Sequence, residues 1–194
     1  MAETETALSH LSAFHRGETG QLSLGVYMAL SAGNLRATLL DYRRRFPNVT
    51  IHVVDGTSTN LISNLAAGSL DIVILAGIHA AWNDSALSLW NERVVVALPD
   101  RHPLCEKKAI QWHELKTEPL LINRRAPGPE FFRLLMTEVG YIEECRLTEH
   151  DVGTDRLLSL VGTGLGLTLV LEGATGAIYP GVAYREVHDK TGST

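Results

Sequence analysis

The stretch from residue 16 to residue 55, RGETGQLSLGVYMALSAGNLRATLLDYRRRFPNVTIHVVD, decides the fold. Within it, the apolar run at residues 22–27 (LSLGVY) predicts a strand, and residues 49–54 predict a second one. Between them Asn34 can cap a helix, which Pro47 ends because proline cannot continue the hydrogen-bond ladder. Two strands joined by a helix predict a right-handed crossover and therefore a parallel sheet.

The helix predicted at residues 34–45 has one apolar face and a basic end. Its apolar side chains recur at spacings of roughly three and four residues, as they do along one face of an α-helix. They are Leu35, Leu39, Tyr42 and Phe46. Residues 43–45 are all arginine and stand in the last turn, where the helix dipole favours cations.

Strands and helices alternate along the rest of the chain. The further predicted strands are residues 71–76, 94–98, 119–123, 146–148, 167–171 and 182–187. The further predicted helices are residues 4–14, a helix that starts near residue 61 and ends at Gly68, a single turn at residues 112–115, and residues 131–139 and 154–161. Residues 71–76 are nearly all apolar, so we expect this strand to be covered on both faces. The alternation predicts an α/β fold.

Composition limits the class of protein. The 194 residues are 45% hydrophobic and 20% charged, which is ordinary for a soluble globular protein of one domain or two small ones. The net charge of −5 argues against this chain gripping a phosphate backbone, because that requires clustered lysine and arginine. Cys105 and Cys145 lack CxxC spacing, so free thiols in a reducing cytoplasm are expected. Neither a membrane span of roughly 20 apolar residues nor a secretory signal is expected.

Five short motifs together resemble the effector-binding domain of LysR-type transcriptional regulators. Two lie in the opening stretch: RGETGQL at residues 16–22, followed by Leu24 and Gly25, and RFPNV at residues 45–49. Three follow in the order that the family shows: GSLDIVI at residues 68–74, LPDRHPL at residues 98–104 and VGTGLGL at residues 161–167. The resemblance extends from residue 16 to about residue 187.

The resemblance implies an α/β fold of two Rossmann-like lobes joined by two crossover strands, the type 2 periplasmic-binding-protein fold. It assigns residues 17–99 and 182–194 to the first lobe and residues 100–181 to the second. Residues 1–16 would be the end of a linker helix, and the family's DNA-binding helix-turn-helix domain is not expected within this chain. The family has further chain after the last predicted strand, so the first lobe is expected to lack part of its structure here.

Candidate ligand contacts follow the predicted strands. In open α/β sheets ligands sit at the carboxyl ends of strands, near helix N-termini whose N–H groups suit carboxylates. The resemblance also places effector contacts at the turn after the second strand. The candidate effector-binding residues are Ser31, Thr57, Ser58, Thr59, Arg124, Arg125, Gly153 and Thr154. Arginine is included because it can hold a carboxylate through two parallel hydrogen bonds.

Each candidate also has a purely structural interpretation. Residues 57–59 can be ordinary helix caps, which is the commoner role of such hydroxyls. Ser31 can be a solvated loop residue. Arg124 and Arg125 can be solvated surface charges, and at most one of the two is expected to reach a ligand.

Other motifs point away from cofactors. A helix precedes the glycines at 162, 164 and 166 and a strand follows, the reverse of a dinucleotide motif, so a helix end with positive φ and a close turn is expected. The eight histidines show no HExxH or paired Cys/His spacing, so neither a metal nor a cofactor is expected. His150 and Asp151 are expected to form a surface pair. Nearby cations leave a thiol-sensing role open for Cys105.

The resemblance implies a ligand-sensing domain of a LysR-type regulator. A small anionic effector would bind between the lobes and bias a homodimer or tetramer on DNA. DNA would be bound only through a helix-turn-helix domain outside this chain. In the dimer, the helix at residues 34–45 would lie against the second lobe of the partner subunit. The expected location is cytoplasmic, without contact to a membrane.

Two other classes of protein share this fold. A solute receptor of a transport system would need export, so a signal sequence upstream would favour it and a helix-turn-helix region upstream would favour the regulator. An enzyme would need a compact cluster of acid, base or nucleophile. The sequence suggests no such cluster, so no catalytic activity is expected.

Overall fold

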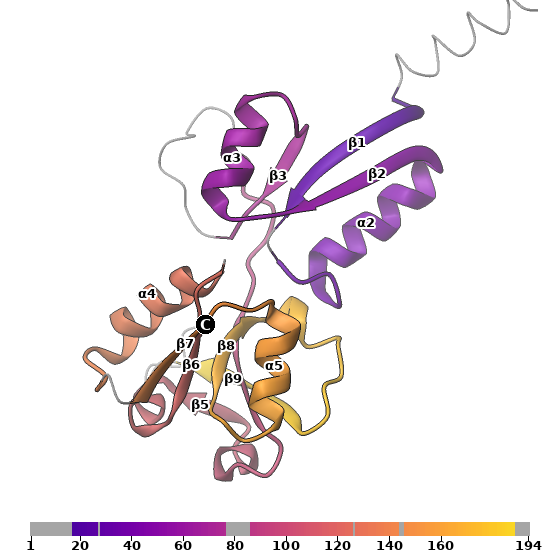
Figure 1. Cartoon of the computed structure of the whole chain (residues 1–194). Helices are drawn as coiled ribbons and strands as arrows, with labels where there is room; N and C mark the ends of the chain where they lie inside the picture. Colours follow the sequence, from indigo (N-terminus) through magenta and orange to yellow (C-terminus); the bar gives the residue numbers. More distant parts are fainter. Residues whose placement is uncertain (1–16, 27, 77–85, 126, 144–145, 189–194) are drawn as a thin grey trace, which may run out of the picture. The chain divides into compact units, whose positions relative to one another are not determined.

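The computed structural model describes residues 17–26, 28–76, 86–125, 127–143 and 146–188 (Figure 1). These residues form two compact units. The first unit contains residues 17–26 and 34–76, and the second contains residues 28–33 and the described residues from 86 to 188. The helix predicted at residues 4–14 lies outside the described residues.

The first unit is a three-stranded parallel sheet in the order β2-β1-β3. Its strands are β1 (Thr19–Val26), β2 (Asn48–Asp55) and β3 (Ile72–Ile74). Its helices are α2 (Gly33–Arg45), which follows β1, and α3 (Ser58–Ala66), which follows β2. The predicted strand–helix–strand crossover is confirmed, since β1 and β2 pair in parallel along their whole length.

The core of the first unit is small. α2 buries Leu35 and α3 buries Leu61. Gly25 of β1 lies close beneath α3, since a Cβ atom there would come within 2.7 Å of Leu70 and 3.0 Å of Leu61. The prediction that the strand at residues 71–76 is covered on both faces is wrong for the described residues. β3 forms an edge of the sheet, and Ile72 remains 46% exposed.

The second unit has six strands. They are β4 (Val94–Pro99), β5 (Ala109–Gln111), β6 (Leu120–Asn123), β7 (Leu147–His150), β8 (Thr168–Leu171) and β9 (Val182–His188). Its helices are α4 (Gly128–Val139) and α5 (Thr154–Gly162), and its 3₁₀ turns are η2 (Pro103–Glu106), η3 (Trp112–Thr117) and η5 (Glu172–Ala174). Every strand predicted after residue 90 is confirmed, whereas β5 was not predicted.

The strands of the second unit form the orders β5-β9-β4-β8 and β6-β7, joined by a bridge between Leu120 and Leu167. β4 runs antiparallel to both of its neighbours, while the other pairs and the bridge are parallel. The carboxyl ends of β5, β6, β7, β8 and β9 therefore lie at one edge of this sheet, where β4 begins. We call it the carboxyl edge.

The two units differ from the predicted lobes in the placement of two strands. The predicted boundaries at residues 99 and 182 coincide with the end of β4 and the start of β9. However, β4 pairs with β8 and β9, and β9 pairs also with β5. Because these ladders run along both strands, β4 and β9 belong to the sheet of the second unit.

Helices cover both faces of the second sheet. On one face Leu135 of α4 packs in a cluster with Val96, Leu98 and Leu169 of β4 and β8. On the other face the buried side chains of α5 meet Val95 and Val170. After α5, Gly164 has a φ of +86°, and a Cβ at Gly166 would lie 2.7 Å from the carbonyl oxygen of Pro119. The predicted helix end and close turn are thus confirmed.

Candidate functional site

The three hydroxyl residues predicted in the first unit gather at the start of α3. Thr57 is the N-cap, and its hydroxyl accepts a hydrogen bond from the backbone N–H of Asn60 at 3.2 Å. Ser58 and Thr59 form the first helical turn, which contains no acidic residue. The positive end of the α3 dipole is therefore not neutralised by a side chain of its own first turn. Such a helix start suits a carboxylate or phosphate group.

The two predicted arginines of the second unit lie at the carboxyl edge, after β6. Nε of Arg124 is 3.8 Å from a carboxylate oxygen of Glu149, and Nε of Arg125 donates to Asp151 at 2.6 Å. All four side chains are more than half exposed. The hydrogen bond from Arg125 and its charge lower the pKa of Asp151. Both arginines thus carry acidic partners, and His150 is not the partner of Asp151 that the sequence suggested.

Gly153 and Thr154 stand at the start of α5, beside the same arginines. Gly153 is the N-cap, with no side chain to accept a bond from the helix. Asp155 in the first turn folds back over it, since a Cβ at Gly153 would lie 2.6 Å from Oδ1 of Asp155. The backbone N–H of Arg124 donates to the carbonyl oxygen of His150 at 2.8 Å. The structure therefore brings the candidates after β6 and β7 together.

Ser31 is not a solvated loop residue. It lies in the segment of residues 28–33 that belongs to the second unit. Its hydroxyl donates to the carbonyl oxygen of Gly173, in η5, at 2.6 Å. Any ligand that used this hydroxyl as a donor would compete with that carbonyl.

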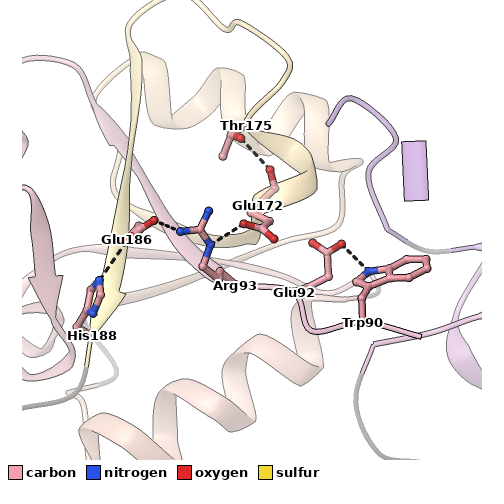
Figure 2. A network of polar contacts seen from close by, with 7 residues as sticks. All are labelled: Trp90, Glu92, Arg93, Glu172, Thr175, Glu186 and His188. Carbon is pink, nitrogen blue, oxygen red and sulfur yellow. Dashed lines mark hydrogen bonds and ion pairs between the residues drawn. The ribbon is translucent and has the colours of Figure 1, made fainter. Parts of the chain in front are cut away.

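A network of charged side chains at the carboxyl edge was not found from the sequence (Figure 2). Arg93, directly before β4, donates through Nε to Glu172 at 2.7 Å and through a second nitrogen to Glu186 of β9. These carboxylates raise the pKa of Arg93, chiefly through the hydrogen bond that Arg93 donates to Glu172. Nε2 of His188 lies 3.2 Å from the other oxygen of Glu186. The partners are 79 and 93 residues from Arg93, so no local pattern could reveal them.

A small cavity of about 20 Å³ lies between α4 and the sheet of the second unit. Its walls include Ile122, Phe131, Leu135 and Leu169. A water molecule needs about 10–15 Å³ of such space, so this cavity can hold a water-sized group and not an effector.

The described part of the chain contains neither a cluster of metal ligands nor a helix that could span a membrane. No three His, Cys, Asp or Glu side chains there come together as metal ligands would. Cys105 is half-buried and its thiol donates to the carbonyl oxygen of Pro99 at 3.2 Å, while Cys145 lies outside the described residues. None of the described helices combines the length and apolar character needed to span a bilayer.

Comparison with known proteins assigns the family. Residues 15–191 match the LysR substrate binding domain, and the chain belongs to this family. TtuA, an HTH-type transcriptional regulator of Agrobacterium vitis, is 32% identical over 155 residues, which are 77% of this chain and 50% of TtuA. AlsR of Bacillus subtilis, also an HTH-type transcriptional regulator, is 27% identical over 179 residues, 89% of this chain and 57% of AlsR. The chain spans about half the length of these curated relatives.

A solved structure agrees with this assignment. The effector-binding domain of BenM, bound to its effector benzoate, superposes with a TM-score of 0.68 at 24% identity, covering 88% of this chain and 78% of that one. The predicted fold class is therefore confirmed as α/β, of the type 2 periplasmic-binding-protein kind. The chain is the ligand-sensing type of domain found in LysR-type transcriptional regulators.

Proposed function

We propose that this chain senses a small anionic effector for a LysR-type transcriptional regulator. The match of residues 15–191 to the LysR substrate binding domain carries the proposal. The regulator binds DNA through a helix-turn-helix domain outside residues 1–194, works in the cytoplasm, and binds its effector without transforming it. The family assignment favours this function over a solute receptor of a transport system.

The start of α3 is the main support for an anionic effector. It combines hydroxyl side chains with a helix dipole and has no acid in its first turn. BenM, of similar fold, binds the carboxylate benzoate. Arg124 and Arg125 are weaker candidates, because an effector carboxylate would first have to displace Glu149 or Asp151. We therefore rank Thr57, Ser58 and Thr59 above the arginines, and Gly153 and Thr154 last because Asp155 already occupies the start of α5.

The proposed assembly is a homodimer or tetramer. In it α2 contacts the second lobe of a partner subunit, as the resemblance to LysR-type regulators implies. α2 has features of a contact helix. Leu40 on its surface is 54% exposed, and its last turn consists of three arginines. Sedimentation tests this part of the proposal: a strict monomer at high protein concentration would contradict it for this chain.

A thermal-shift screen tests the sensing function. The probes are benzoate, succinate and glutamate, measured against the wild type, Thr57→Ala, Arg124→Ala and the control Thr38→Ala. Thr38 is an exposed hydroxyl residue of α2 that bonds only within its own helix in the described chain. A ligand that binds the native state at 100 times its Kd adds about 2.7 kcal/mol of stability, so Tm should rise with dose.

The variants locate the site. Thr57→Ala should lose most of the ligand-induced rise in Tm, Arg124→Ala should lose little of it, and Thr38→Ala should lose none. A rise that Thr57→Ala leaves intact would contradict the placement at α3. No rise with any of the three carboxylates, for a folded wild type, would contradict the anionic effector class that they represent.

A further inference from the structure

In the segment that leads from β1 to α2, two hydrogen-bond donors share a single carbonyl group of the second unit. The carbonyl oxygen of Gly173, in η5, accepts the backbone N–H of Ala32 at 2.9 Å and the hydroxyl of Ser31 at 2.6 Å. Both donors belong to residues 28–33, which lie in sequence between two elements of the first unit but form part of the second. This connection is therefore held to η5 by contacts remote in sequence.

Two glycines make the close approach possible. A Cβ atom at Gly176 would lie 2.2 Å from the carbonyl oxygen of Ser31, and one at Gly173 would lie 3.0 Å from the carbonyl oxygen of Ala29. The first distance is far below any real contact, and backbone cannot yield as the end of a flexible side chain can. The attachment therefore combines the Ser31 hydroxyl, bare backbone in and after η5, and the packing of Ala29 against the core of the second unit.

The turn that receives the segment is itself fixed from the other side (Figure 2). The backbone N–H of Glu172 donates to the carbonyl oxygen of Arg93 at 2.9 Å, and its carboxylate accepts from Arg93 Nε at 2.7 Å. The hydroxyl of Thr175 donates to the carbonyl oxygen of Glu172 at 2.8 Å. Arg93 is anchored in turn by Glu186. The Gly173 carbonyl thus has a defined position against which the connection can dock.

Gly33 stands directly after the attached residues and is the first residue of α2. Its φ is +79°, a backbone conformation that residues with a side chain rarely adopt. The division between the units falls between Gly33 and Asn34. Gly33 therefore marks the end of the attached segment.

We infer that Ser31, Ala32 and η5 form a latch that holds residues 28–33 in place within the second unit, with Gly33 as the joint at which the held segment ends. Two hydrogen bonds have a modest net worth in water, so opening of the latch is reversible. The latch makes Ser31 a positioning residue in the unliganded chain. It is independent of the proposed effector, and its test requires no ligand.

Hydrogen exchange of the unliganded chain, read by mass spectrometry, tests the latch. Ser31→Ala removes one of its bonds, and Gly176→Ala drives the segment off η5 while leaving Ser31 in place. We expect exchange in peptides covering residues 28–36 and 172–178 to rise about fivefold in Ser31→Ala and further in Gly176→Ala. The matched control is Ser159→Ala, which removes a 2.9 Å hydrogen bond from a hydroxyl to a backbone carbonyl at an exposed position of α5.

The outcomes separate a latch from other roles. Faster exchange confined to those two peptides, with Ser31→Thr close to wild type, supports the latch. Unchanged exchange in both variants overturns it. Faster exchange spread over β4, β8 and β9 also overturns it, because Ser31 would then serve the folding of the whole unit.

Gly33→Ala tests the joint separately. Alanine disfavours a positive φ, so this variant should also raise exchange at residues 28–36 although Ser31 is intact. Wild-type exchange in Gly33→Ala would overturn the assignment of the joint.

Discussion

The two units bury their sheets to very different extents. In the first unit, Val53 of β2 is 41% exposed and Ile72 of β3 is 46% exposed. In the second unit all four residues of β8 are buried, and Val96, Ala97 and Leu98 of β4 have no exposed surface. Since burial of apolar surface is the main source of stability, we expect the second unit to have the larger free energy of unfolding. The first unit is the part of the described chain that a single substitution should unfold.

The candidate ligand contacts of the two units also differ. The first unit offers uncharged hydroxyls at a helix start, whereas the second offers arginines that already have acidic partners. The candidate ligand contacts of the two units are therefore not equivalent, because they differ in charge and in whether they already have partners. Three substitutions test this comparison.

Leu61→Ala should have the largest effect. Leu61 has no exposed surface and belongs to a small core, so its loss should cost about 2–5 kcal/mol. Exchange protection in β1, β2 and α3 should be lost while α5 and β8 stay protected. The matched control is Leu158→Ala in α5, where the residue is 1% exposed but the core is larger, so its unit should stay folded. Loss of protection in both units of either variant would show that they unfold together and break the comparison.

Thr57→Ala should have an intermediate effect. It removes the side-chain cap of α3, which typically costs about 1 kcal/mol, whereas Thr57→Ser keeps the hydroxyl and should cost much less. The measurement is urea unfolding followed by a probe placed in the first unit. Equal stability of the two variants would show that the bond to Asn60 does not hold the helix start, and it would leave Thr57 free for a ligand.

Arg125→Gln should have the smallest effect on stability, because the pair it breaks is more than half exposed. The readout is the pKa of Asp151, followed by NMR. It should rise toward the ordinary value of 3.8, because the hydrogen bond and charge of Arg125 are the largest causes that lower it. Arg124→Gln is the control and should raise it less, since Arg124 is the weakest cause.

The sign of the pH dependence follows from the same pair. A carboxyl group whose folded pKa is lowered stabilises the fold above its unfolded pKa and loses that contribution as pH falls through the folded pKa. The stability difference between wild type and Arg125→Gln should therefore be present above about pH 4 and vanish in stronger acid. A difference that persists in strong acid would assign Arg125 a role other than its pair with Asp151.

Local sequence signals predicted most of the elements. The apolar runs, the stop at Pro47 and the glycine after α3 fixed strands and helices close to their observed bounds. β5 has three residues and the 3₁₀ turns have three to six, too few for a periodic pattern to emerge. The exposure of β3 was missed because an apolar run predicts a strand but does not reveal what covers it.

The sequence by itself determined the α/β class, the order of the elements, the LysR resemblance and the candidate residues at strand and helix ends, because each depends on neighbours along the chain. Only the tertiary structure decided that Arg124 and Arg125 are paired, that Ser31 docks on Gly173, and that Arg93 joins Glu172 to Glu186. Those contacts join residues 25 to 142 positions apart. Their partners are chosen by the packing of the sheet, and no local pattern encodes that choice.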